Sequence, residues 1–125
     1  MSPREIEALA ERLFTAIAVG DADTVAACYH PDVQIWHNHS GRVQGLDENL
    51  KMLRWLNRTI TGFKYDAVER TCFEGGFVQR HVLRGTVVDQ TIEAPTCMVG
   101  QVRDGKVFRL HEYMDSAHIA PLLRR

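Results

Sequence analysis

In the first 19 residues, apolar side chains recur every three or four positions, which is the spacing of a helix that buries one face. The opening Ser-Pro-Arg-Glu run after Met1 combines a capping box with proline at the first helical position. We therefore expect a helix over residues 3–19 that ends at Gly20. A short second helix follows from Asp21, and the His-Pro pair at residues 30–31 ends it.

After the second helix the sequence pattern changes from that of a helix to that of a strand, and a helical pattern returns after a loop. Residues 32–37 (DVQIWH) are rich in strand-forming side chains and predict a strand, and the polar stretch 38–45 predicts a loop. Asp47 is expected to cap a third helix over residues 48–60, because a leucine-rich stripe at helical spacing follows it.

From residue 63 onward the pattern is that of strands, joined by Gly-containing turns. Asp104-Gly105 is the strongest turn signal, because both residues tolerate the positive φ of a type I′ hairpin. Pro95 cannot donate a ladder hydrogen bond, so its strand should begin on an edge or at a bulge. The expected strands cover residues 63–73, 77–88, 91–102 and 106–115.

Helices followed by strands indicate an α+β fold, in which a curved antiparallel sheet wraps around the N-terminal helices. A long, strongly curled sheet and its helices would enclose a conical pocket suited to a small molecule. The chain length of 125 residues indicates a single domain over residues 1–125.

The composition and charge of the chain limit the classes of partner that it can bind. The net charge of −1 and the interspersed charges give no basic footprint for nucleic acid or an anionic membrane. There is no spanning segment and no signal-peptide pattern at the N-terminus, so the cytoplasm is the expected location. The three cysteines are odd in number and widely separated, which favours reduced thiols over disulfides or a zinc site. We expect no cofactor and no metal.

Several segments together resemble the nuclear-transport-factor-2-like superfamily. They are the Gly20-Asp21 corner, the DVQIWH strand, the Gly45-Leu46 helix entry, the strand from Arg80 to Gly85-Thr86 and the ending DGKVFRLHEYMD. Within it the chain is similar to the SnoaL-like proteins, which include polyketide cyclases, limonene-epoxide hydrolase and ketosteroid isomerase. The resemblance implies a cystatin-like α+β cone and a ligand pocket, while the chemistry differs among members.

The last strand carries unusual polar chemistry. Strict alternation separates Arg109, His111, Tyr113 and Asp115 from a more apolar row of Phe108, Leu110, Glu112 and Met114. We expect the polar row to line the pocket and the apolar row to form a homodimer contact on the convex face. The resemblance makes Asp115 the leading catalytic acid or base, since it matches the aspartate that ends a YFD-type motif. The alternative is that Asp115 only caps the segment that follows.

Arg80 is the next catalytic candidate, because a strand cation needs a partner and it matches the arginine that bridges acidic groups in hydrolase-like relatives. Only one of Arg80 and His81 can line the pocket, since neighbours in a strand point to opposite faces. A solvent-facing Arg80 is the alternative. Val82 stands where the hydrolase pattern has a second aspartate, which argues against epoxide hydrolysis by the Asp-Arg-Asp arrangement.

His37 is the third catalytic candidate, because a histidine at a strand end has the intrinsic pKa for proton transfer near neutrality. Metal binding by His37 and His39 lacks a further ligand at recognisable spacing. The residues expected to bind substrate are Trp36, Asn38, Trp55, His81, Cys97, His111 and Tyr113.

Two functions remain open from the sequence. One is a cofactor-independent acid/base enzyme, an isomerase, cyclase, hydratase or hydrolase, that acts on a small and mostly apolar molecule. The alternative is a non-catalytic module of the same fold that binds a ligand or dimerises. The loop 39–45 is a candidate lid with glycines as hinges.

Overall fold

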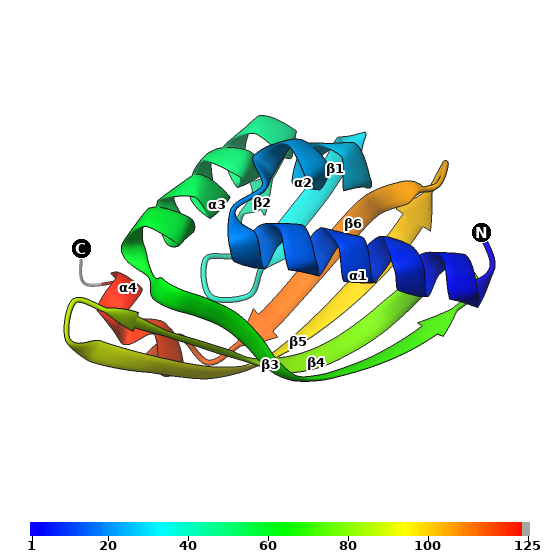
Figure 1. Cartoon of the computed structure of the whole chain (residues 1–125). Helices are drawn as coiled ribbons and strands as arrows, with labels where there is room; N and C mark the ends of the chain where they lie inside the picture. The colour runs from blue at the N-terminus through cyan, green and yellow to red at the C-terminus, as the bar shows by residue number, and fades with distance from the viewer. Residues whose placement is uncertain (124–125) are drawn as a thin grey trace.

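A computed structural model describes residues 1–123, and the last two residues of the expected domain, 124 and 125, lie outside the described residues. Helices cover one face of a curved, unclosed sheet, in agreement with the predicted α+β cone (Figure 1). The elements are α1 (Pro3–Val19), α2 (Ala22–Cys28), β1 (Tyr29–His37), β2 (Val43–Gln44), α3 (Leu46–Thr59), β3 (Thr61–Phe73), β4 (Gly76–Val87), β5 (Gln90–Arg103), β6 (Lys106–Met114), the 3₁₀ helix η1 (Ser116–Ile119) and α4 (Ala120–Leu123).

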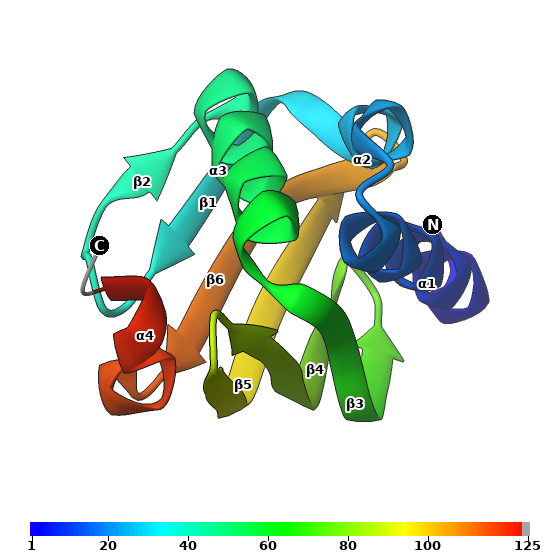
Figure 2. The same ribbon diagram turned by 60° about the vertical axis from the view of Figure 1, so that its left-hand side comes forward.

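The strand order is β2-β1-β6-β5-β4-β3, so the first and last long strands are neighbours. All pairs are antiparallel except β1 and β6, which run parallel. The expectation of a purely antiparallel sheet is therefore wrong at this one pair. In Figure 2, α3 crosses over the sheet and carries the chain from the edge at β1 and β2 to the opposite edge at β3. The chain then comes back strand by strand through β4 and β5 to β6, which lies beside β1 and runs in the same direction.

The N-terminal signals act as the residue types predict. The Ser2 hydroxyl accepts from the Glu5 amide at 3.2 Å and the Glu5 carboxylate accepts from the Ser2 amide at 2.9 Å, while Gly20 ends α1 with a φ of 77°. The expected cap at Asp47 is wrong, because α3 already begins at Leu46. Its N-cap, Gly45, offers no side-chain hydrogen bond.

The C-terminal hairpin is the predicted one, with φ values of 53° at Asp104 and 74° at Gly105. Pro95 lies in β5 opposite Val82 of β4, but β6 pairs with β5 only from Thr96 onward. On that side Pro95 has no strand neighbour, so its missing N–H breaks no ladder.

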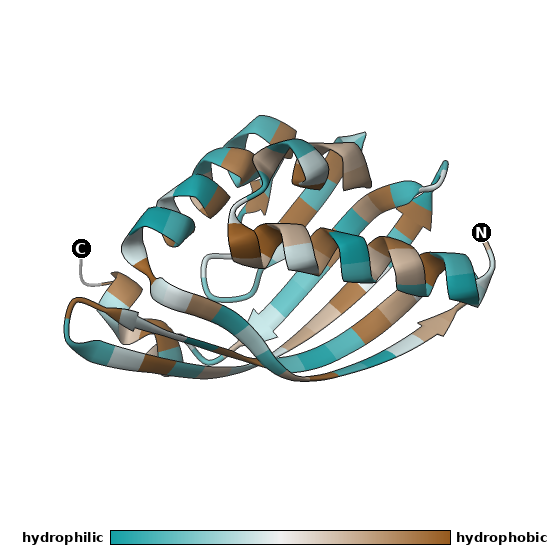
Figure 3. Cartoon of the chain, in the orientation of Figure 1, coloured by the Kyte–Doolittle hydropathy of each residue, from teal (hydrophilic) through white to brown (hydrophobic). Residues whose placement is uncertain are grey.

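Hydrophobic side chains pack into two clusters on the helix-covered face. The larger one joins α1 and α2 to the middle of the sheet through residues such as Leu13 and Phe77. The smaller one brings Ile119 and Leu122 of the C-terminal segment against β4 and β5. Figure 3 shows the corresponding alternation of hydrophobic and hydrophilic positions along the strands. The residues after Asp115 therefore close one end of the sheet.

Within residues 1–123, we find no helix that combines the length and the apolar character needed to cross a bilayer. Cys28, Cys72 and Cys97 are all free thiols. The predicted loop 39–45 contains the short strand β2, which pairs with Ile35 and Trp36 of β1. Part of this loop is thus tied to the sheet edge.

One fold-level prediction concerns close packing at Gly100. A Cβ added there would lie 2.4 Å from the fully buried Phe77 ring. We expect Gly100→Ala to lower the free energy of unfolding by about 1–3 kcal/mol, because the ring must leave its position. Urea unfolding measures this. Gly45→Ala is the control, since a Cβ there meets no atom within 4 Å, and an equal loss in both variants would contradict the packing explanation.

Candidate active site

The helices and the concave face of the sheet enclose a cavity of about 160 Å³. Its wall is mostly apolar, and the C-terminal segment contributes Ile119, Leu122 and Leu123. The groups in the wall that can exchange or share a proton are Tyr29, His37, His39, Tyr65, His81 and Glu112. An apolar cavity with a few convergent polar groups is the usual form of a small-molecule site.

Glu112 of β6 and His37 of β1 are cross-strand neighbours in the parallel pair. His37 Nε2 lies 3.9 Å from Glu112 Oε1, a separation longer than a hydrogen bond. Both side chains are largely buried, with exposed fractions of 10% and 13%. The end of β1 therefore brings an imidazole beside a carboxyl inside the cavity.

The Glu112 carboxyl is the most perturbed acid of the site. Burial in the apolar cavity raises its pKa from 4.5 to about 7. Every fully buried side-chain nitrogen or oxygen of the described residues has a hydrogen-bond partner, and no described residue donates one to this carboxyl. Its oxygens therefore face the space of the cavity, and both protonation states are populated near neutral pH.

His37 has the opposite shift. Burial, with a smaller contribution from His39, lowers the pKa of His37 to about 4. The rings of the two histidines are 5.6 Å apart. At neutral pH His37 is therefore an uncharged imidazole next to Glu112, able to donate or accept one hydrogen bond.

A series of side-chain hydrogen bonds joins α3 to the strands beneath it at one side of the cavity. The Tyr29 hydroxyl donates to Asn49 Oδ1 at 3.0 Å, and Asn49 Nδ2 donates to Gln44 Oε1 at 2.9 Å. Asn49 is the one fully buried residue of α3 within the described chain, so this amide fixes α3 over β1 and β2. Burial raises the pKa of Tyr29, which keeps its hydroxyl protonated.

The opposite wall carries Tyr65 of β3 and His81 of β4, whose rings pack edge to face at 4.5 Å. Burial raises the pKa of Tyr65, and the charge of Glu112 raises it further, which indicates that the phenol and the carboxyl share one space. Burial lowers the pKa of His81 to about 4, with a smaller contribution from the positive charge of Arg70.

Among the residues expected from the sequence to form the site, the structure brings His37, His81 and Trp55 to the cavity. His81 is thus the inward residue of the pair at positions 80 and 81. Asn38 does not line the cavity, and its Oδ1 accepts from the Met114 amide at 3.0 Å. This bond ties the ends of β1 and β6 together.

The expected face assignment of the last strand is wrong. Leu110, Glu112 and Met114 line the cavity. His111 and Tyr113 lie on the convex face instead, where both rings contact Trp36 at centroid distances of 5.4 and 5.3 Å. Because helices cover only the concave face, this part of the more apolar row turns inward and the polar residues turn outward. Phe108 is the exception, since a register shift in the β5–β6 pairing turns Val107 into the core instead.

The expected pocket positions of Arg80, Cys97 and Asp115 are also corrected. Arg80 is 68% exposed and pairs with Glu69 on the convex face, where Cys97 lines a shallow groove. Asp115 is exposed, and its carboxylate accepts from the Ala117 amide at 2.9 Å. It therefore caps η1, which was the alternative interpretation of this residue.

The residue that sequence reasoning missed is Glu112. Its signal was present, since it is the single charged side chain in the row with Leu110 and Met114. A carboxylate between residues that pack inward is rarely buried without a function.

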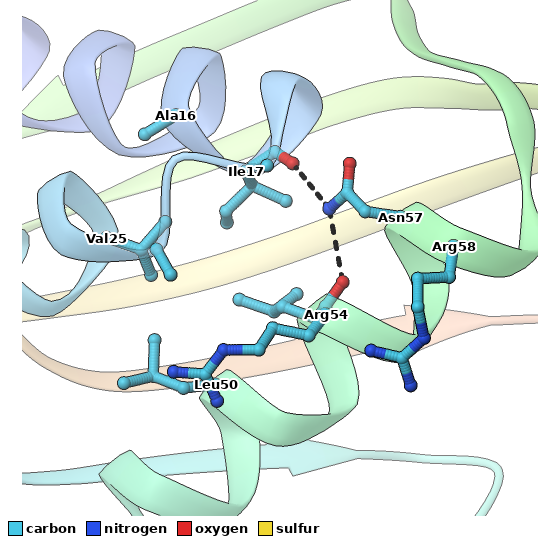
Figure 4. Close-up of a pocket in the computed structure, with 10 residues that line it drawn as sticks. Ala16, Ile17, Val25, Leu50, Arg54, Asn57 and Arg58 are labelled. Carbon is cyan, nitrogen blue, oxygen red and sulfur yellow. Dashed lines mark hydrogen bonds between the residues drawn. The ribbon is translucent and has the colours of Figure 1, made fainter.

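A second groove lies between the α1-α2 corner and α3, with a volume of about 230 Å³ (Figure 4). Asn57 crosses it, and its Nδ2 donates to the backbone oxygens of Ile17 and Leu53 at 3.1 Å each. Arg54 and Arg58 are its charged lining residues, and no acid lines it. The groove is a seam between helices, so we place the chemistry in the cavity.

The described residues hold no group of three or more histidine, cysteine, aspartate or glutamate side chains arranged to bind a metal ion. The rings of His37 and His39 are neighbours, but within the described residues they belong to no such group.

In a comparison with protein-family models, the model of the family described as the SnoaL-like domain matches residues 10–110 of the chain. A comparison with curated proteins finds no match. Similar solved structures include a Mycobacterium tuberculosis LEH-like epoxide hydrolase, with 20% identity, coverage of 98% of this chain and 92% of that chain, and a TM-score of 0.82.

Two further structures have the same fold. A putative polyketide cyclase from Xanthomonas campestris pv. campestris has 20% identity, covers 92% of this chain and 93% of its own, and has a TM-score of 0.82. A Catenulispora acidiphila protein with a ketosteroid isomerase-like fold, in complex with trimethylamine, has 9% identity, coverage of 95% and 91%, and a TM-score of 0.79. At these identities the comparisons show a shared fold.

The raised pKa of Glu112 predicts a pH-dependent stability difference. The folded protein binds the proton more tightly than the unfolded chain between pH 4.5 and about 7, so raising the pH through this window destabilises the fold. Glu112→Gln stays neutral and avoids this cost. We expect its stability relative to the original chain to rise by about 2 kcal/mol between pH 5 and pH 8, measured by urea unfolding.

His37 and His81 are present in both proteins, so their titration cancels in this difference. Glu74→Gln, at an exposed turn position, is the control and should give the same small difference at both pH values. A flat profile for Glu112→Gln would contradict the burial of an ionisable carboxyl in the cavity.

Proposed function

This chain belongs to the SnoaL-like domain family, and from that premise we propose that it is a cofactor-independent acid/base enzyme. Its substrate would be a small, mostly apolar molecule with a carbonyl, hydroxyl or epoxide oxygen. The observation that carries the proposal is the Glu112 carboxyl, which faces an apolar cavity 3.9 Å from the Nε2 atom of His37 and has no hydrogen-bond partner among the described residues.

Glu112 is proposed to transfer the proton. A group whose pKa lies near the working pH serves equally as acid and base, because each form is populated and neither holds the proton too tightly. As a carboxylate it would take a proton from carbon next to a carbonyl, and the C–H electron pair would move toward the carbonyl oxygen. As a carboxylic acid it would return that proton to another carbon, or protonate an epoxide or leaving oxygen.

His37 is proposed to assist as a neutral hydrogen-bonding partner. Its lowered pKa makes it a weak base at neutral pH, so orientation of Glu112 or of a water molecule suits it better than proton abstraction. Trp55 and the leucines and methionines of the wall would hold the apolar part of the substrate. Asp115 and Arg80, the earlier catalytic candidates, have no part in this mechanism.

The proposal predicts that Glu112→Gln loses proton transfer. We expect the original chain to accelerate hydrogen–deuterium exchange beside the carbonyl of cyclohexanone, or hydration of cyclohexene oxide, both followed by NMR. Removal of the acid/base group should lower the rate by about 10²–10⁴-fold. Asp115→Asn is the matched control, since it changes a carboxylate outside the cavity and the asparagine oxygen can still cap η1.

Full activity of a folded Glu112→Gln variant would refute the assignment. If the original chain binds the ketone or epoxide but converts neither, the alternative of a non-catalytic ligand-binding module is favoured. The cytoplasmic location stays a prediction from the sequence.

We also propose a homodimer that forms through the convex sheet face. Support comes from the aromatic group of Trp36, His111 and Tyr113, in which Tyr113 is 45% exposed, and from the neighbouring Val99, which is 36% exposed. Isolated exposed apolar side chains are ordinary, but a contiguous aromatic group is typical of a contact surface. This aromatic group replaces the dimer contact expected from the sequence, the apolar row of the last strand, since Leu110 and Met114 of that row face the cavity.

The dimer predicts a concentration-dependent sedimentation coefficient. Sedimentation velocity at micromolar concentration should show a dimer, and Tyr113→Lys should shift it to the monomer, because a charge would be buried in the contact. Val19→Lys places the same charge on an exposed valine of α1 and should leave the dimer unchanged. A monomeric original chain would refute this proposal.

A further inference from the structure

A chain of hydrogen bonds lies behind His81, on the side away from the cavity space. Arg70 of β3 donates through Nη1 to Glu7 Oε1 at 2.6 Å and to Glu11 Oε2 at 3.1 Å, both on α1. Its Nε lies 2.7 Å from Gln79 Oε1, and Gln79 Nε2 lies 2.9 Å from His81 Nδ1. Gln79 is fully buried, so its contact with His81 is shielded from water, whereas the Glu7 and Glu11 carboxylates are exposed.

The chemistry of the donors fixes the direction of every bond in this chain. A guanidinium can only donate, so the Gln79 atom that Arg70 contacts must be the amide oxygen. The amide nitrogen then faces His81, and since it also can only donate, His81 Nδ1 must accept. An imidazole that accepts at Nδ1 is neutral and carries its single proton on Nε2.

The series of hydrogen bonds from Arg70 to His81 depends on a β-bulge in β3. The pairing of β3 with β4 shifts register between Asp66 and Glu69, and Ala67 there has a φ of 52°. Tyr65 and Arg70, which have opposite parity, can therefore both face the interior. The Arg70 side chain is only 5% exposed, and the two α1 carboxylates compensate its charge.

His81 Nε2 reaches the cavity. His81 lines it, and every fully buried side-chain nitrogen or oxygen of the described residues has a partner. His81 Nε2 has none among them, so it faces open space. His81 lies on β4 and Glu112 on β6. On β5, the strand between them, Thr96 pairs with His81 and Met98 pairs with Glu112, so the two polar groups are two strands and two residues apart. At about 4.8 Å per strand, the two polar groups are on the order of 10 Å apart.

We infer that Arg70 and Gln79 are positioning residues that hold His81 as an Nε2–H donor, so that the cavity selects ligands with a hydrogen-bond acceptor oxygen at the end away from Glu112. The inference rests on the cavity being the ligand site, as proposed above. An acceptor such as a carbonyl or ether oxygen satisfies the donor, whereas an ammonium cation or a pure hydrocarbon leaves it unpaired. The lowered pKa of His81 agrees with a ring that stays neutral at physiological pH.

The first test measures the His81 tautomer in the unmodified protein. Long-range ¹H–¹⁵N correlation NMR of the imidazole side chains distinguishes a protonated from an unprotonated ring nitrogen. We expect His81 to show a protonated Nε2 and an unprotonated Nδ1 at every pH from 5.5 to 8. A proton on Nδ1 at pH 7, alone or with Nε2 also protonated, would overturn the inference without any variant.

The second test reverses the bond from Gln79. Gln79→Glu keeps an acceptor for Arg70 but turns a second acceptor toward His81, which must then carry a proton on Nδ1. Gln101→Glu is the matched control, since the same change at an exposed position of β5 should leave the His81 signals unchanged. If a folded Gln79→Glu variant retains the original tautomer, Gln79 does not position the ring.

The third test concerns the ligand class. Cyclohexanone should shift the His81 Nε2–H resonance of the original chain, and methylenecyclohexane, which has the same shape without the oxygen, should bind about 3–10-fold more weakly without that shift. Equal affinity for both probes would overturn the selectivity.

These readouts need no turnover, so they separate two failures. Loss of the tautomer or of the selectivity refutes this inference, while full activity of Glu112→Gln refutes only the proposed acid/base role.

Discussion

The structure depends on one constraint, which is that side chains alternate across a sheet that helices cover on a single face. Each strand then sends every second residue into the cavity and the others to the convex surface. This alternation places His81 inside and Arg80 outside, and Glu112 inside and Tyr113 outside. The bulge near Ala67 is where β3 changes phase, and it lets both Tyr65 and Arg70 point inward.

Desolvation then sets the chemistry of the groups that this constraint gathers. Burial disfavours charge on either kind of group, so it raises the pKa of Glu112 to about 7 and lowers those of His37 and His81 to about 4. The pKa of Glu112 therefore lies above those of the two histidines, which is the reverse of the usual order for these residue types. A cavity of this kind lowers the stability of the fold in exchange for a carboxyl that can exchange its proton near neutrality.

Hydrogen bonds link the elements that enclose the cavity. Asn49 links α3 to Tyr29 and Gln44, and the cap from Asp115 orders the segment that brings Ile119 and Leu122 over one end. Each is a buried or terminal hydrogen bond, whose loss would leave a partner unpaired. Residues that look catalytic in the sequence can thus serve the site through structure alone, as Asp115 does.

The sequence by itself predicted the first three helices, the five long strands and the final hairpin, because caps, turn residues and periodicity are local properties of the chain. It did not predict β2, η1 or α4. The Ser2 cap, the Gly20 stop and the Asp104-Gly105 turn could all be predicted from neighbours within a few residues. The cone was predicted from the resemblance to a known family. Of the residues named from the sequence, His37, Trp55 and His81 line the cavity. Only the tertiary structure decided which face of the last strand turns inward, since that depends on where helices from the other end of the chain come to rest. For the same reason the approach of Glu112 to His37, and the ion pairs of Arg70 with Glu7 and Glu11, emerged only when elements distant in sequence became neighbours.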